Sequence, residues 1–128
     1  MAREPDVLKA LVGIHVLLVD GDQYARELLE SVLTYGGAFV ASSADAQEAL
    51  AYFQKKGGDV VIADVTLPND EGYRLVREIG ARVPMLAITT GSGDGPDRTL
   101  AAGFHAHLRK PVDPWELCRL VAGLARKA

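Results

Sequence analysis

The stretch Val60-Val61-Ile62-Ala63-Asp64 decides the fold of this chain. Four apolar residues follow one another without a polar interruption, and a carboxylate comes directly after them. An unbroken apolar run is typical of a strand that is buried on both faces, whereas a half-exposed strand alternates apolar and polar residues. The stretch therefore predicts a strand inside a parallel sheet, with Asp64 at its carboxyl end.

Similar apolar runs lie on both sides of this stretch, and helical patterns separate them. The expected strands are 14–19, 39–41, 60–63, 85–88 and 106–108. Apolar residues at helical spacing predict helices over 23–35, 46–56 and 71–81, and a last helix that begins at Pro114 with Asp113 as its cap. The alternation predicts an α/β fold, with a doubly wound, five-stranded parallel sheet and helices on both faces. The short segment before Gly13 is expected to be helical or loose.

The composition is that of a small, mildly acidic domain. The chain has 128 residues, with 14 basic and 17 acidic side chains and a net charge of −3. This length fits one domain, and the acidity argues against direct nucleic-acid binding. A single cysteine excludes a disulfide framework and a site of several thiolates. No apolar run approaches the roughly 18–20 residues of a membrane helix, and the N-terminus lacks a signal-peptide core, so a soluble, cytoplasmic domain without membrane contact is expected.

Polar residues follow the expected strands at the edge where parallel strands end. Asp20, Asp64, Thr89 and Lys110 each come after an apolar run, and open parallel sheets bind ligands at the carboxyl ends of their strands. One aspartate after a strand is usually a cap or turn residue, but four complementary groups indicate a site. Paired carboxylates favour Mg²⁺, which gathers phosphate oxygens, and a carboxylate can itself accept a phosphoryl group. The four residues therefore predict phosphoryl chemistry with Mg²⁺.

Four blocks of the sequence resemble the response-regulator receiver domain of two-component signalling. They are Val16–Asp20, Val60–Asp64 with Leu67-Pro68 and Glu71-Gly72, Leu86–Thr89, and Lys110-Pro111. The resemblance extends from about Ile14 to the end, and the helix sequences most resemble receivers of hybrid histidine kinases. It implies a flavodoxin-like sheet with strand order 2-1-3-4-5. It also implies a single receiver domain over 1–128, with an N-terminal extension over about 1–13 and a core over 14–126.

The same resemblance implies how the predicted site is used. Asp64 would be the phosphoacceptor, which takes a phosphoryl group from a phosphohistidine on a histidine kinase or histidine phosphotransfer protein. Mg²⁺ would be held by Asp20, Asp64 and the backbone carbonyl of Thr66. Such a domain is not an enzyme beyond self-catalysed phosphoryl acceptance and slow autodephosphorylation.

A switch that connects the site to a partner surface is also implied. Thr89 would be the switch hydroxyl, Lys110 would pair with the phosphate, and His107 stands where receivers often carry the aromatic residue that moves with Thr89. Phosphorylation is expected to shift Thr89, His107 and the loop Gly91–Asp97. Output to a downstream protein partner, and a homodimer if one forms, would use the face over about 97–126.

One position departs from the receiver pattern. Receivers carry two adjacent acids after the first strand, whereas this chain has Asp20-Gly21-Asp22. Asp22 either contributes to the metal pocket in place of Gly21 or only caps the following helix. Losing an anionic ligand should weaken Mg²⁺ binding. The alternative function is therefore a degenerate pseudo-receiver, a protein-interaction module that works without phosphorylation.

A remote alternative comes from a different class of protein. Asp20-Gly21-Asp22 also resembles the first motif of haloacid-dehalogenase-like phosphatases, and Gly93–Asp97 is similar to their late acidic motif. In this chain, however, that motif precedes Lys110 instead of following it. There is also no room for a cap domain, and Asp64 would have no role. Turnover of a generic phosphate ester would favour this alternative.

Overall fold

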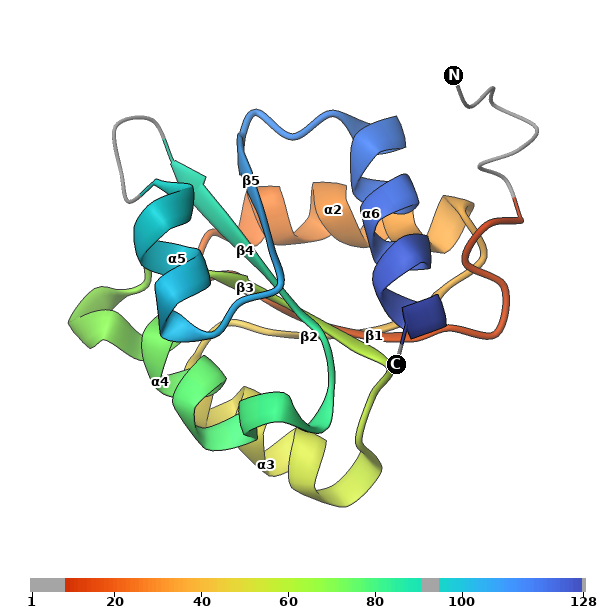
Figure 1. Ribbon diagram of the computed structural model, residues 1–128. Helices are drawn as coiled ribbons and strands as arrows, with labels where there is room; N and C mark the ends of the chain where they lie inside the picture. Colours follow the sequence, from red (N-terminus) through yellow and green to blue (C-terminus); the bar gives the residue numbers. More distant parts are fainter. Residues whose placement is uncertain (1–8, 91–94, 128) are drawn as a thin grey trace.

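The computed structural model describes residues 9–90 and 95–127, and it contains one parallel sheet. The strands are β1 (His15–Val19), β2 (Phe39–Ser43), β3 (Val60–Asp64), β4 (Met85–Thr90) and β5 (Ala106–Lys110). They lie in the order β2-β1-β3-β4-β5, and every neighbouring pair is parallel. The predicted five-stranded sheet and its strand order are confirmed, with β3 at the centre of the sheet (Figure 1).

Helices cover both faces of the sheet, as the alternation of runs predicted. One face carries α2 (Gln23–Tyr35) and α6 (Pro114–Lys127), and the other carries α3 (Ala46–Lys56), α4 (Glu71–Ile79) and α5 (Pro96–Ala102) (Figure 1). Short 3₁₀ turns, η1 (Pro68–Asp70) and η2 (Gly80–Arg82), flank α4. In the described ranges, no helix has the length and apolar character that a membrane crossing requires.

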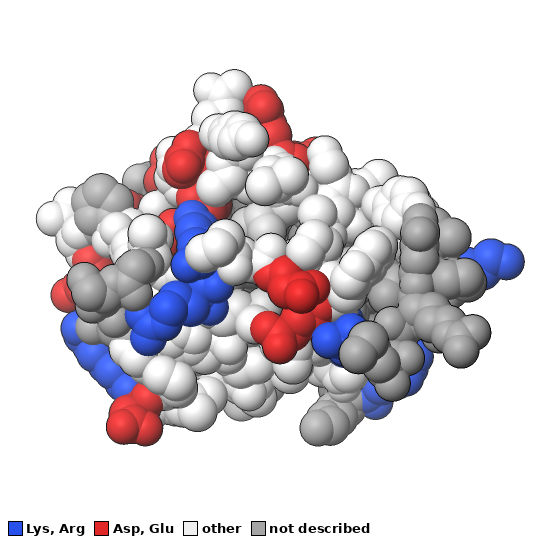
Figure 2. Space-filling model, turned by 90° about the horizontal axis from the view of Figure 1, so that it is seen from above, with Lys and Arg blue, Asp and Glu red and all other residues white. Residues whose placement is uncertain are grey.

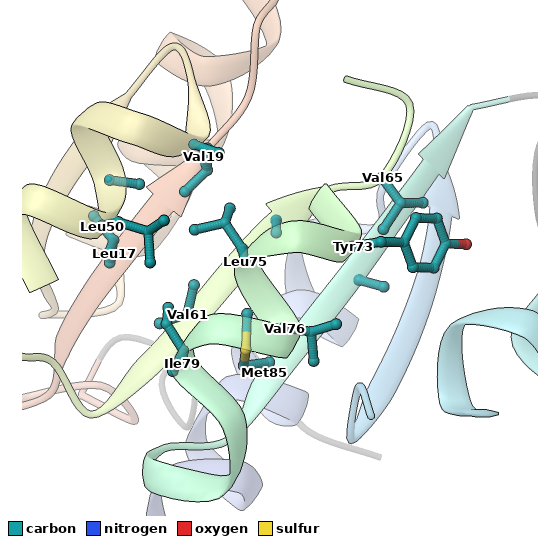
Figure 3. Packing of buried hydrophobic residues seen from close by; sticks show 14 of the residues in the cluster. Leu17, Val19, Leu50, Val61, Val65, Tyr73, Leu75, Val76, Ile79 and Met85 are labelled. Atoms are coloured by element: carbon teal, nitrogen blue, oxygen red, sulfur yellow. The ribbon is translucent and has the colours of Figure 1, made fainter. Parts of the chain in front are cut away.

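Two hydrophobic cores lie on opposite faces of the sheet because successive strand residues point to opposite sides. Leu17 and Val61 pack with α3 and α4 in one core, where Figure 3 shows Leu75 and Ile79 of α4 against the strands. The preceding residues of the same strands join the core beneath α2 and α6. This double burial explains why the strands read as unbroken apolar runs in the sequence.

The predicted helix boundaries agree closely with the structure, with one difference. Helices α2 and α3 have the predicted bounds, and the carboxylates of Asp22 and Asp45 accept hydrogen bonds from backbone N–H groups in their first turns. The helix expected over 71–81 instead ends at Ile79. Gly80 adopts φ 63°, its N–H donates to the Val76 carbonyl, and the chain then continues as η2. A glycine in this conformation ends a helix, because it turns the chain out of the helical path at little steric cost.

The segment before β1 is partly anchored to the fold. Leu11 is completely buried, and its N–H donates to the Gly36 carbonyl at 2.9 Å. Residues 9–13 form turns. The rest of the segment predicted to be helical or loose, residues 1–8, lies outside the described residues.

Candidate functional site

Three of the predicted site residues meet at the carboxyl edge of the sheet. Asp20 directly follows β1, Asp64 ends β3, and Lys110 ends β5. The Lys110 ammonium lies 2.9 Å from Asp20 Oδ2 and 3.2 Å from Asp64 Oδ2. Both carboxylates are buried, with Asp20 1% and Asp64 5% exposed. One partly exposed cation therefore holds together two buried anions that come from different strands.

The charges in this cluster depend on one another. Burial raises the pKa of Asp20, and this outweighs the lowering by the hydrogen bonds from Lys110 and the Asp22 N–H. Burial acts to lower the pKa of Lys110, but its hydrogen bond to Asp20 and the charges of both carboxylates raise it overall. Lys110 is therefore firmly charged near neutral pH, and the two carboxylates depend on it for neutralisation.

The two oxygens of Asp64 have different partners. Oδ1 accepts hydrogen bonds from the backbone N–H of Thr66 at 2.7 Å and from the Thr66 hydroxyl at 2.5 Å, while Oδ2 faces Lys110. These donors fix the orientation of the carboxylate at the end of β3. Thr66 is exposed, so this end of the site is open to solvent.

An open pocket lies over Asp64. Its lining consists of Gly21, Asp22, Ala44, Asp64, Thr66, Leu67, Glu71, Thr90 and Lys110. Sequence reasoning did not assign Glu71 or Thr90 to the site. Glu71 starts α4, and the Gly72 beside it approaches the backbone of Asp64 closely. Thr90 follows Thr89 on a strand that is longer than predicted, and alternation along that strand could have indicated its exposure.

The residues at this edge suit a Mg²⁺ ion with few protein ligands. The carboxylates of Asp20 and Asp64 both lie beside Lys110, and Thr66 lines the pocket over Asp64. Carboxylate and carbonyl oxygens are hard donors, and Mg²⁺ is usually bound by one or two carboxylates while it keeps several waters. A cluster of three or more acidic, histidine or cysteine ligands is not found in the part of the chain that the structure describes. Asp22 lines the pocket, but its Oδ1 accepts from the Tyr24 N–H at 3.0 Å and caps α2. The set fits Mg²⁺ with one anionic ligand fewer than the receiver pattern has.

Thr89 is not among the residues that line this pocket. It is completely buried, and its Oγ1 is 2.9 Å from His107 Nε2, so the structure brings the predicted switch pair into contact. The other ring nitrogen of His107 is 3.0 Å from the hydroxyl of Thr99, a buried residue on α5. No motif marked Thr99 in the sequence. Of the loop expected to move, Gly91–Asp97, the part 91–94 lies outside the described residues.

An apolar groove adjoins the pocket. It runs between the exposed side of α2 and the start of α6, and it is lined by Ala25, Leu28, Leu29, Val32, Lys110, Pro111, Val112, Pro114 and Leu117. Lys110 lines both this groove and the pocket over Asp64. Figure 2, which looks onto the face of α2 and α6, shows a largely uncharged surface with separate groups of acidic and basic side chains.

Comparisons with known proteins agree on one family. The family model described as response regulator receiver domain matches residues 16–122. An uncharacterized 14.6 kDa protein of Leptolyngbya boryana is 36% identical over 121 residues, which cover 89% of this chain and 92% of that protein. The transcriptional regulatory protein GltR of Pseudomonas aeruginosa is 36% identical over 126 residues, which cover 91% of this chain and 50% of the regulator.

Another relative and two solved structures extend this pattern. The sensor histidine kinase RcsC of Salmonella typhimurium is 33% identical over 101 residues, 76% of this chain but 11% of the kinase. The chemotaxis protein CheY4 of Vibrio cholerae superposes with a TM-score of 0.77 at 29% identity, covering 87% of this chain and 98% of that one. A response regulator receiver protein of Burkholderia phymatum superposes with a TM-score of 0.80 at 28% identity. The match covers 88% of this chain and 95% of that one.

Proposed function

The chain belongs to the response regulator receiver domain family of two-component signalling, and on that premise we propose that Asp64 accepts a phosphoryl group from a phosphohistidine in a Mg²⁺-dependent reaction. The observation that carries the proposal is the pairing of Asp64 and Asp20 through Lys110. A buried carboxylate at the mouth of a pocket, beside a charged ammonium, has the groups that phosphoryl transfer requires.

Each residue has a defined part in the proposed reaction. A carboxylate oxygen of Asp64 forms a bond to phosphorus while the P–N bond of the phosphohistidine breaks, and the leaving imidazole keeps the electron pair and takes up a proton. Lys110 lies close enough to Asp64 to pair with the oxygens of the incoming phosphoryl group. When bound by Asp20, Asp64 and the Thr66 carbonyl, Mg²⁺ supplies positive charge that offsets the repulsion between carboxylates and phosphate.

The phosphodonor is proposed to be a histidine kinase or a histidine phosphotransfer protein. One of the relatives is itself a sensor histidine kinase, and this chain matches 11% of its length. The apolar groove between α2 and α6 supports docking of such a protein, because its lining includes Lys110, whose ammonium lies beside Asp64. A phosphorylated domain would pass the signal on through the face over about 97–126, either to a downstream protein or to a second copy of itself.

A pseudo-receiver is the second candidate, and Gly21 favours it. The position of the second acid carries no side chain, and Asp22 is engaged as the cap of α2. In this version the domain binds its partner without phosphorylation. The remote phosphatase alternative is disfavoured, because the receiver family match extends over residues 16–122.

Intact-mass measurement after incubation with Mg²⁺ and acetyl phosphate separates the two candidates. We expect a mass gain of one phosphoryl group that is lost in Asp64→Asn and retained in Asp59→Asn. Asp59 directly precedes the same strand at its opposite end, where its carboxylate accepts from the His15 N–H, so it provides a matched control. Absence of the gain in the unsubstituted protein, with beryllofluoride also failing to bind, would establish the pseudo-receiver.

A further inference from the structure

A chain of three buried or half-buried side chains connects the edge of the sheet to helix α5. The His107 ring lies between two hydroxyls, with Thr89 Oγ1 2.9 Å from Nε2 and Thr99 Oγ1 3.0 Å from Nδ1. Both threonines are completely buried. Thr99 Oγ1 also lies 3.2 Å from the carbonyl of Pro96, in the first turn of α5.

Counting protons indicates which way these hydrogen bonds run. A neutral imidazole has one N–H donor and one nitrogen acceptor, and each hydroxyl has one proton to donate. If Nδ1 carries the proton, it donates to Thr99, the Thr99 hydroxyl donates to the Pro96 carbonyl, and the Thr89 hydroxyl donates to Nε2. The protons of Nδ1, the Thr99 hydroxyl and the Thr89 hydroxyl then each have an acceptor among these contacts. If Nε2 carries the proton instead, it donates to Thr89, and the Thr89 proton needs an acceptor elsewhere.

The ring is neutral near neutral pH, as this count requires. Burial lowers the pKa of His107, and the nearby Arg109 lowers it further. The proton count and the lowered pKa together favour a neutral resting ring with its proton on Nδ1, the side of α5.

We propose that Thr99 is a positioning residue for the switch. It holds the proton of His107 on Nδ1, so that Nε2 accepts the hydrogen bond of Thr89 and the Thr89 hydroxyl stays directed at the ring. The resting part of this proposal needs no phosphorylation. Its second part rests on the proposed function. Once Asp64 carries a phosphoryl group, the Thr89 hydroxyl donates to a phosphoryl oxygen, and both hydrogen bonds of the His107 ring reverse.

The reversal creates no net charge, because the half-buried ring releases its Nδ1 proton to water and takes up one proton from water at Nε2. The ring changes from the Nδ1–H to the Nε2–H tautomer and donates to Thr89, while the Thr99 hydroxyl turns from the Pro96 carbonyl to donate to Nδ1. The first turn of α5 thereby loses a side-chain hydrogen bond. Phosphorylation of Asp64 therefore changes a hydrogen bond of α5 directly. A purely apolar residue in place of His107 could not transmit this change, because it has no ring nitrogens.

The resting state is tested by long-range ¹H–¹⁵N NMR of the three histidines in the unphosphorylated protein, with His107 assigned by substitution. We expect protonated Nδ1 and unprotonated Nε2 in the unsubstituted protein and in Thr99→Ser, which keeps the hydroxyl. In Thr99→Val, which has nearly the same shape without the hydroxyl, Nε2 should move into the protonated range. An Nε2–H ring in the unsubstituted protein overturns the proposal whether or not any variant folds, and so does an unchanged ring in folded Thr99→Val.

The second part is tested by adding beryllofluoride and Mg²⁺ to the same samples. We expect the unsubstituted protein to change to the Nε2–H tautomer. A protein whose amide signals around Asp64 shift while His107 keeps its Nδ1 proton would overturn the relay and leave the proposed function intact. If no signal around Asp64 shifts, the proposed function has failed. The reversal is then rejected with it, because no ligand reaches Asp64, and the resting-state result is judged separately.

Discussion

Lys110 has a structural role in the site, in addition to the chemical role proposed above. Its ammonium is the cation shared by Asp20 and Asp64, whose side chains are 1% and 7% exposed. Buried carboxylates without a cation are strongly unfavourable, because desolvation of a charge costs more than packing returns. Any cation that enters the pocket therefore meets two carboxylates that one ammonium neutralises only in part, and it has to share them with Lys110.

Because both carboxylates are paired with Lys110, we expect Lys110→Gln to destabilise the domain. Loss of the ammonium should lower the unfolding free energy by about 3–5 kcal/mol, the range for breaking a buried ion pair. Burial already raises the pKa of Asp20. The difference in unfolding free energy between the variant and the unsubstituted protein should therefore shrink as pH falls through that pKa, because the carboxylate becomes neutral. Urea unfolding at several pH values measures this. Lys55→Gln, at the end of α3, is the control, and equal stability of both variants would contradict the prediction.

Gly21 is the residue whose replacement should change metal binding most directly. Gly21→Asp restores an anionic ligand next to Asp20, so Mg²⁺ should bind at least about tenfold more tightly, equivalent to ~1.4 kcal/mol. A Cβ there would lie 3.1 Å from Leu67 Cδ2, so the substitution requires the flexible tip of Leu67 to shift by a few tenths of an ångström. Calorimetric titration measures the affinity.

Gly123→Asp is the matched control for this experiment. It adds the same charge on α6, where a Cβ has open space around it. Unchanged Mg²⁺ affinity in a folded Gly21→Asp variant would show that the missing acid is not what limits the site.

At the level of helices, the start of α4 is fitted to the end of β3. A Cβ on Gly72 would lie 2.8 Å from the Asp64 carbonyl oxygen and 2.8 Å from the Val65 Cα, both of them backbone atoms that cannot move aside cheaply. Glycine at this position therefore lets α4 begin directly beside Asp64. The packing brings the first turn of α4, with Glu71, to the rim of the pocket.

Gly72→Ala should therefore disturb both stability and the site. We expect a loss of about 1–3 kcal/mol, the usual cost of overpacking, together with a shift of the Thr66 amide signal next to Asp64. Gly123→Ala is the control. In the open surroundings of Gly123, alanine should keep or raise stability by up to ~1 kcal/mol through its helix propensity. A stable Gly72→Ala variant with an unmoved Thr66 signal would refute the close-packing argument.

Local signals in the sequence were sufficient for most of the elements. Helices α2 and α3 follow from their apolar spacing together with a capping aspartate, and Asp113 caps α6 as predicted by accepting from the N–H groups of Trp115 and Glu116. These signals are carried by neighbouring residues. The apolar pattern of α4 ends at Ile79, and the prediction extended the helix two residues further because it did not treat Gly80, which adopts a positive φ, as a stop.

The site was predictable only in part, because its geometry depends on contacts between distant residues. The meeting of Asp20, Asp64 and Lys110 follows from parallel strands that share one edge. Thr89 and His107, the two residues of the expected switch, are in contact, but the contact of His107 with Thr99 was not predicted. Its contact depends on how α5 packs against β5, and no residue pattern in α5 reports that packing.

Stability of the entire fold should depend on the charge of His107. Because burial and Arg109 lower the pKa of His107 below its ordinary value, the folded state opposes its protonation. The contribution of the neutral His107 ring to the unfolding free energy is fully present above about pH 6.5, the pKa of histidine in the unfolded chain. It is lost as pH falls through the pKa of His107 in the folded state. Between about pH 7.5 and 5.5, the unfolding free energy of the unsubstituted protein should fall more than that of His107→Phe. Parallel pH profiles for the two proteins would disprove this linkage.

The two ion pairs of Lys110 join residues at the ends of three strands, and this has a consequence for folding. Lys110 is 90 positions from Asp20 and 46 from Asp64, so the pair spans contacts of very high sequence separation, which form late and slowly. A nascent chain that has not yet released β5 from the ribosome has no such pair, however well β1 to β4 have folded. A ligand of the completed pocket at 100 times its Kd would then stabilise the finished domain by ~2.7 kcal/mol over every partly folded form that lacks β5.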